Sequence, residues 1–149
     1  MSTMSTWCRI PEQEITGNAF FILETGRVEK AKKQFIDHLL QQRPNLKEVF
    51  SVSDCDVIVV FCPISSRAGS DIDAALEKLN KLSETKSAIF VVLHHTFDPE
   101  RTVPDSSRII NRLNTLTVDC LFQEDIGLLN CSLNDESQPK VVQQFKCVE

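Results

Sequence analysis

Three stretches of the chain are apolar at every position, unlike the alternating pattern of a half-exposed strand. They are AFFIL (19–23), VIVVFC (57–62) and AIFVVL (88–93). Strands whose two faces are both covered, as in a parallel sheet between layers of helices, have this uniform pattern. A fourth stretch, LTVDCLF (116–122), begins by alternating, with Thr117 and Asp119 opposite the apolar positions. We expect this stretch to form a half-exposed edge strand.

Apolar residues recur at helical spacing between these strands, over 26–43 and over 70–82. Pro44 ends the first helix, because the residue before a proline is pushed out of helical geometry. Ser70 is placed to cap the second helix, with Asp73 three residues later in a variant of the capping box.

The remaining segments have weaker patterns. LKEVFSV (46–52) is either a short edge strand or a frayed helix end, and we favour the strand. A short helix capped by Ser106 or Ser107 is expected to run towards Leu113. The last helix is expected to start at Pro139, because proline suits a first helical turn.

This alternation of strands and helices predicts an α/β fold. The expected architecture is a three-layer α-β-α sandwich with a mainly parallel sheet, Rossmann-like or flavodoxin-like, and strand order 2-1-3-4-5. A length of 149 residues suits one domain over 1–149. We expect 1–15 to be a loosely ordered N-terminal segment.

Composition narrows the classes of partner. A net charge of −5 opposes general attraction to nucleic acid or to an anionic membrane, and no apolar run reaches the length of a membrane span. The first residues contain no signal peptide, so we expect a cytoplasmic, reducing location with free thiols. The six cysteines form no close pair of the kind that zinc sites use, so no metal is predicted. No cofactor is predicted either.

A ligand site in such a fold lies at the switch point, where adjacent connections leave the carboxyl ends of two strands on opposite faces. Here the loops 24–27 and 63–70 open onto that point, and HH at 94–95 ends the neighbouring strand. The candidate ligand-binding residues are Glu24, Thr25, Arg27, Ser65, Ser66, Arg67, Asp71 and His95.

The chemistry of these candidates leaves alternatives open. Arg67 and the serine hydroxyls suit an anion, but Asp71 and Asp73 would repel a phosphate and better suit the hydroxyls of a ribose. The glycine-rich motifs of dinucleotide and nucleoside triphosphate sites are absent. The turn can equally be a purely structural connection.

Other residues could also take part in catalysis. One of the two histidines could act as a general base aided by Glu24 or Asp71, or could simply bind strand-end carbonyls. Cys62 is a nucleophile only beside a histidine, and otherwise a core thiol. The catalytic residues stay unknown.

Four segments, CDVIVVFCPISSRAGSDIDAAL, VVLHHTFDP, VPDSSR and VDCLFQEDIGLL, carry a resemblance to a multigene family of uncharacterised fish proteins. The resemblance covers most of the chain from Phe20 to Cys131 and implies a family without implying a function. In architecture the strand–turn–helix segment is similar to flavodoxin-like, TIR-like and deoxyribosyltransferase-like domains, which host many unrelated functions. No specific TIR motif is present, so no residue roles follow.

Two functions therefore remain at the level of sequence. The first is a cytosolic binding or protein-interaction module that uses the switch-point loops or the polar loop 95–108, with a protein partner or a second copy of the chain. The lack of a complete catalytic constellation favours it. The second is a small nucleotide- or nucleoside-handling enzyme, a hydrolase or transferase, with its ligand at the switch point.

Overall fold

The three uniformly apolar stretches form the centre of one sheet in the computed structural model, which describes residues 14–65 and 67–147. They are β2 (Ala19–Glu24), β4 (Val57–Ile64) and β5 (Ser87–His95). The six-stranded order is β3-β2-β4-β5-β6-β7, completed by β3 (Lys47–Glu48), β6 (Thr115–Gln123) and β7 (Gly127–Leu128). All neighbours are parallel except β6 and β7.

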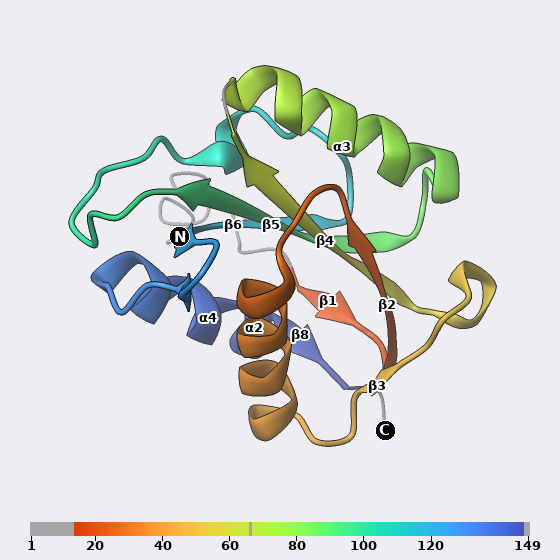
Figure 1. Ribbon diagram of the computed structural model, residues 1–149. Helices are drawn as coiled ribbons and strands as arrows, with labels where there is room; N and C mark the ends of the chain where they lie inside the picture. Colours follow the sequence, from red (N-terminus) through yellow and green to blue (C-terminus); the bar gives the residue numbers. More distant parts are fainter. Residues whose placement is uncertain (1–13, 66, 148–149) are drawn as a thin grey trace, which may run out of the picture.

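Helices cover both faces of this sheet (Figure 1). Two of them, α2 (Glu29–Gln42) and α4 (Ser132–Gln144), pack on one face, and α3 (Ala68–Leu82) packs on the other. Alternate residues of β4 serve the two cores: Val59 and Phe61 face α2, whereas Val60 and Cys62 face α3. The expected α/β class with a mostly parallel sheet is confirmed.

The strand order differs from the expected 2-1-3-4-5 because a sixth strand, β7, extends the sheet and makes it mixed. Gly127 allows the chain to reverse there, with a φ of 94° that L side chains rarely adopt. The expectation of a half-exposed edge strand over 116–122 is wrong. Asp119 is only 8% exposed, because the 96–114 connection, β7 and α4 cover this strand.

Three helix starts also differ from expectation. Helix α3 begins at Ala68, and its N-cap Arg67 makes no side-chain cap bond, so Ser70 lies in the first turn and does not cap it. The expected helix towards Leu113 is a single 3-10 turn, Ser106–Arg108, capped by Asp105. Helix α4 begins before Pro139, which lies inside it, because the polar inner side of α4 gives no apolar stripe in the sequence.

A small second sheet adds to the core on the α2 side of the main sheet. It pairs β1 (Ile15–Thr16) with β8 (Phe145–Lys146) in parallel, and both Ile15 and Phe145 are fully buried. The expected loosely ordered segment over 1–15 falls, apart from its last two residues, outside the described part of the chain. None of the helices among the described residues has the length and apolar character to cross a membrane.

Candidate functional site

The two switch-point loops close against each other at the carboxyl ends of β2 and β4. The Thr25 hydroxyl and backbone N–H both donate to the carbonyl of Phe61, at 3.2 and 3.1 Å. A Cβ added to Gly26 would lie 2.6 Å from the ring of Pro63. Thr25 therefore holds the loop onto β4, and Gly26 leaves no space for a ligand between the loops at this contact.

The β4–α3 turn is held by the aspartate that sequence reasoning assigned to a ligand. The carboxylate of Asp71 accepts the backbone N–H of Ser65 at 3.0 Å, which ties the turn to the first turn of α3. The side chains of Ser65 and Arg67 are exposed to solvent. Ser66, the remaining candidate of this turn, lies outside the described residues.

A cavity of about 490 Å³ lies on the α2 side of the same sheet end. Its volume is in the range of small-molecule sites. It includes two of the predicted residues, Glu24 and Arg27, but none of Thr25, Ser65, Arg67, Asp71 and His95. Its walls are the start of α2 and the end of β6, with lining residues Glu24, Gly26, Arg27, Val28, Glu29, Lys30, Ala31, Phe122 and Glu124.

Charges of both signs line this cavity. Glu24 is engaged, because its carboxylate binds the Lys32 ammonium at 2.7 Å, and this hydrogen bond raises the pKa of Lys32. The Lys30 ammonium donates to the carbonyl of Asp125 in the β6–β7 turn. Arg27 is exposed at the rim.

The predicted histidine of the site, His95, belongs to a row of aromatic rings. Its ring packs edge-to-face on Phe122, with centroids 5.4 Å apart, and on Phe97 at 5.9 Å. Phe122 is buried and lines the cavity, whereas Phe97 is 75% exposed. His95 thus links the cavity wall to an exposed phenylalanine at the end of a central strand.

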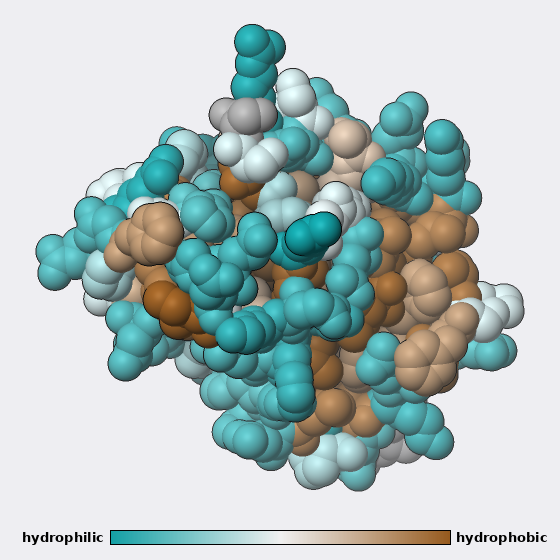
Figure 2. All heavy atoms as spheres, in the orientation of Figure 1, coloured by the Kyte–Doolittle hydropathy of each residue, from teal (hydrophilic) through white to brown (hydrophobic). Residues whose placement is uncertain are grey.

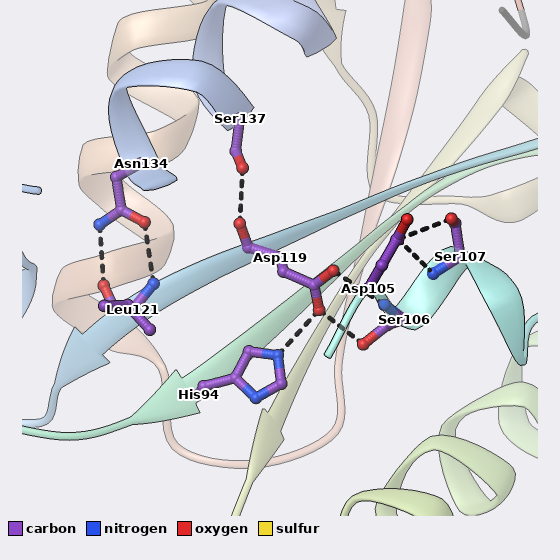
Figure 3. A network of polar contacts seen from close by, with 8 residues as sticks. All are labelled: His94, Asp105, Ser106, Ser107, Asp119, Leu121, Asn134 and Ser137. Carbon is purple, nitrogen blue, oxygen red and sulfur yellow. Dashed lines mark hydrogen bonds and ion pairs between the residues drawn. The ribbon is translucent and has the colours of Figure 1, made fainter. Parts of the chain in front are cut away.

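The other histidine, His94, lies on the opposite face of β5 in a buried network that sequence reasoning missed. Its Nε2 is 2.8 Å from Oδ1 of Asp119, which also accepts the Ser106 hydroxyl at 2.5 Å (Figure 3). The backbone N–H of Ser106 donates to Oδ2 at 2.9 Å. The only signal in the sequence was an acidic residue inside a strand pattern, which suggested a solvent-facing position.

This network has the residue types of a hydrolytic triad but not its order. In a triad the serine hydroxyl donates to a histidine, which takes up the proton. Here Ser106 donates to Asp119 and not to His94, so the hydroxyl lacks the histidine base of a triad, and all three side chains are less than 9% exposed. The network ties the 96–114 connection to the sheet and offers no nucleophile to solvent.

The buried thiols are also unsuited to nucleophilic chemistry. Burial raises the pKa of Cys62 to about 11, which keeps it as the neutral thiol near pH 7. Burial likewise raises the pKa of Cys120 and of Cys55. The described residues contain no group of histidine, cysteine or acidic side chains that could hold a metal ion.

Comparison with protein families and with curated proteins finds no match for this chain.

Proposed function

We propose that this chain is a protein-binding module whose contact surface is the carboxyl end of the sheet, centred on Phe97. The observation that carries the proposal is the row Phe97–His95–Phe122, which holds a large apolar ring 75% exposed at the end of β5. Burying a phenylalanine contributes about 1.5–3 kcal/mol, and exposure at Phe97 leaves most of this gain unused. A partner that covers the ring recovers it.

The geometry around Phe97 suits an anchor residue of a protein interface. Aromatic residues dominate binding energy when they are fixed before binding, because less side-chain entropy is then lost. The edge-to-face contact with His95 supports one side of the Phe97 ring, and the loop beyond it is held to the sheet at Ser106. Ile126, 57% exposed in the β6–β7 turn beside cavity residue Glu124, adds a second apolar contact near the cavity.

A photo-crosslinking experiment tests this surface. A photoreactive phenylalanine at position 97 is compared with one at Leu113, which is 83% exposed on the connection before β6. We expect a protein captured at position 97 and not at 113, and Phe97→Ala should weaken its binding about 10- to 100-fold, the equivalent of the buried ring. Unchanged affinity of Phe97→Ala for the captured protein would contradict the proposal.

One observation favours a second candidate, a nucleotide- or nucleoside-handling enzyme. The cavity of about 490 Å³ includes Glu24 and Arg27 at the carboxyl end of β2. Adenosine, AMP and NAD are suitable probes in a thermal-shift assay, because a ligand that binds only the folded state raises the melting temperature. Stabilisation should be lost in Arg27→Ala and kept in Arg67→Ala, since Arg67 does not line the cavity; no stabilisation by any probe would reject this candidate.

A further inference from the structure

The two edges of the main sheet differ in whether their outward backbone groups are hydrogen-bonded. At the β6 edge, β7 pairs with Phe122 and Gln123. Where β7 ends, side chains of α4 form hydrogen bonds with the backbone of β6. Asn134 accepts the N–H of Leu121 and donates to its carbonyl, both at 2.8 Å, and Ser137 donates to the carbonyl of Asp119 (Figure 3). No strand can add to this part of the edge, because its hydrogen-bonding groups are already paired.

The β2 edge is open along its carboxyl half. Ala19 and Thr25 bond to the β4 side, so alternate residues such as Ile22 and Glu24 direct their N–H and C=O groups outward. The neighbouring strand β3 opposes only Ala19 and Phe20. Within residues 14–65 and 67–147, no strand pairs with β2 beyond that point on this side, and Figure 1 shows the short β3 at the lower end of β2.

Apolar side chains surround the open edge. The chain leaves the sheet after the N–H of Val49 bonds to the carbonyl of Phe20, and the next residue, Phe50, is 83% exposed. A groove of about 440 Å³ runs between β2 and α2, with an apolar floor of Ile22, Ile36 and Leu40. Figure 2 shows hydrophobic side chains gathered over the part of the molecule where β2 lies.

The charges of this groove indicate which partner fits. The numbers of basic and acidic residues in its lining are equal, although the whole chain has a net charge of −5. These residues are Lys30, Lys32, Lys33, Glu29, Asp37 and Glu48. Within one copy Lys32 pairs with Glu24 and Glu29, and Lys33 pairs with Asp37, so the groove carries little net charge. Two copies related by a twofold axis can extend these pairs by placing lysines of one opposite acids of the other, because in an isologous interface residue i of one copy contacts residue j of the other and j contacts i. A strongly acidic or basic partner would meet like charge there.

The short length of the open edge also favours a second copy over an extended peptide. A peptide gains only the few hydrogen bonds that Ile22 and Glu24 offer. Antiparallel pairing of β2 with β2 of a second copy forms the same number of hydrogen bonds as a peptide would, but it also covers two Phe50 rings and two grooves.

We propose that the chain forms a homodimer in which the open edges of β2 pair antiparallel, extending the sheet across both copies. This interface is separate from the Phe97 surface, so either can fail without the other. Each copy contributes the same groups: the outward backbone of Ile22 and Glu24, the Phe50 ring and the α2–β2 groove.

Sedimentation velocity over a concentration series of the full chain tests the dimer. Phe50→Glu places a charge at the interface without disturbing the core and should raise the dimer dissociation constant at least tenfold. Leu113→Glu is the matched control, because Leu113 is equally exposed at 83% and lies far from β2 along the sheet order. The control should dimerise as the unmodified chain does.

Hydrogen exchange locates the contact. The amides of Ile22 and Glu24 should exchange more slowly at high protein concentration, and Phe50→Glu should abolish that dependence. A chain that is monomeric at every concentration would overturn the proposal, as would a dimer that Phe50→Glu leaves intact or that Leu113→Glu dissociates equally.

Discussion

Asn134 offers a sharp test of how α4 is held to the sheet. This residue is 2% exposed, and its amide makes three hydrogen bonds of 2.8 Å, with the N–H and C=O of Leu121 and with the C=O of Leu129. Replacement by alanine removes all three. The Leu121 carbonyl still accepts the N–H of Leu129 at 3.0 Å, so the Leu121 N–H and the Leu129 carbonyl are left without a partner.

The expected cost follows from these two orphaned groups. A buried polar group without a partner costs about 1–3 kcal/mol, and the Leu129 carbonyl, which is only part-buried, falls at the low end of this range. Asn134→Ala should therefore lower the free energy of unfolding by about 2–4 kcal/mol. This is a large share of the stability of a typical domain, about 5–15 kcal/mol. Urea unfolding followed by circular dichroism measures it, with exposed Asn111→Ala as a control expected to change stability by less than about 0.5 kcal/mol.

Asn134→Asp separates hydrogen-bond geometry from packing, because the side chain keeps its size. One carboxylate oxygen would still accept the Leu121 N–H, but the other would face the carbonyl oxygens that the amide now serves. Such surroundings raise the pKa of the introduced carboxyl above its unfolded value. The destabilisation relative to the unmodified chain should therefore be full at neutral pH and shrink as pH falls, when the protonated acid becomes a donor.

Two results would refute this account. A loss below about 0.5 kcal/mol for Asn134→Ala would show that water or a shift of α4 satisfies the strand edge. A pH-independent difference between Asn134→Asp and the unmodified chain would show that the carboxyl does not face the two carbonyls.

Three further outcomes are expected. Asp119→Asn should lower the free energy of unfolding by about 2–4 kcal/mol in urea titrations. One carboxylate oxygen of Asp119 accepts the Ser106 hydroxyl and lies 2.8 Å from His94, and the other accepts the Ser106 backbone N–H. An amide has a single acceptor oxygen and cannot replace both. Cys62, with its pKa near 11, should react with iodoacetamide at pH 8 about 100-fold more slowly than a thiol of ordinary pKa, whereas equal rates in the native protein would contradict its burial. In urea titrations, Gly127→Ala should destabilise the chain by about 1–3 kcal/mol, since its φ is +94° and the added Cβ would lie 2.5 Å from Gln34. The comparison Gly69→Ala, in the first turn of α3 with no atom within 4 Å of the added Cβ, should stabilise the chain by about 0.4–1 kcal/mol.

The local sequence pattern was sufficient to predict an element where one feature, such as an apolar run or a proline, was unambiguous. The uniformly apolar runs predicted β2, β4 and β5, and Pro44 predicted the end of α2. The pattern was insufficient where polar side chains serve the interior. Asp119 was expected to face solvent because it is charged. The start of α4 was expected at Pro139, because the buried side of the preceding turns carries Asn134 and Ser137, which bind the backbone of β6 and form no apolar stripe.

For the candidate site, the sequence indicated which loops meet but not what their side chains face. Asp71 was assigned to a ligand, but its carboxylate accepts the backbone N–H of Ser65. This contact forms because α3 begins at Ala68 and so places Asp71 in its first turn. The cavity beside Glu24 and Arg27 is completed by Phe122, which lies about a hundred residues further along the chain. Contacts between such distant residues depend on how the helices cover the sheet.

The sequence by itself determined the class of the fold, because a strand that is apolar at every position must be covered on both faces. It also excluded the glycine-rich phosphate loops, because those need particular residues at fixed spacing. Only the tertiary structure decided that the β6 edge is closed by Asn134 and Ser137 while, among the residues that the structure describes, no strand pairs with the carboxyl half of β2 on its outer side. Whether a strand edge is open depends on what packs beside it, which the pattern within the strand does not contain.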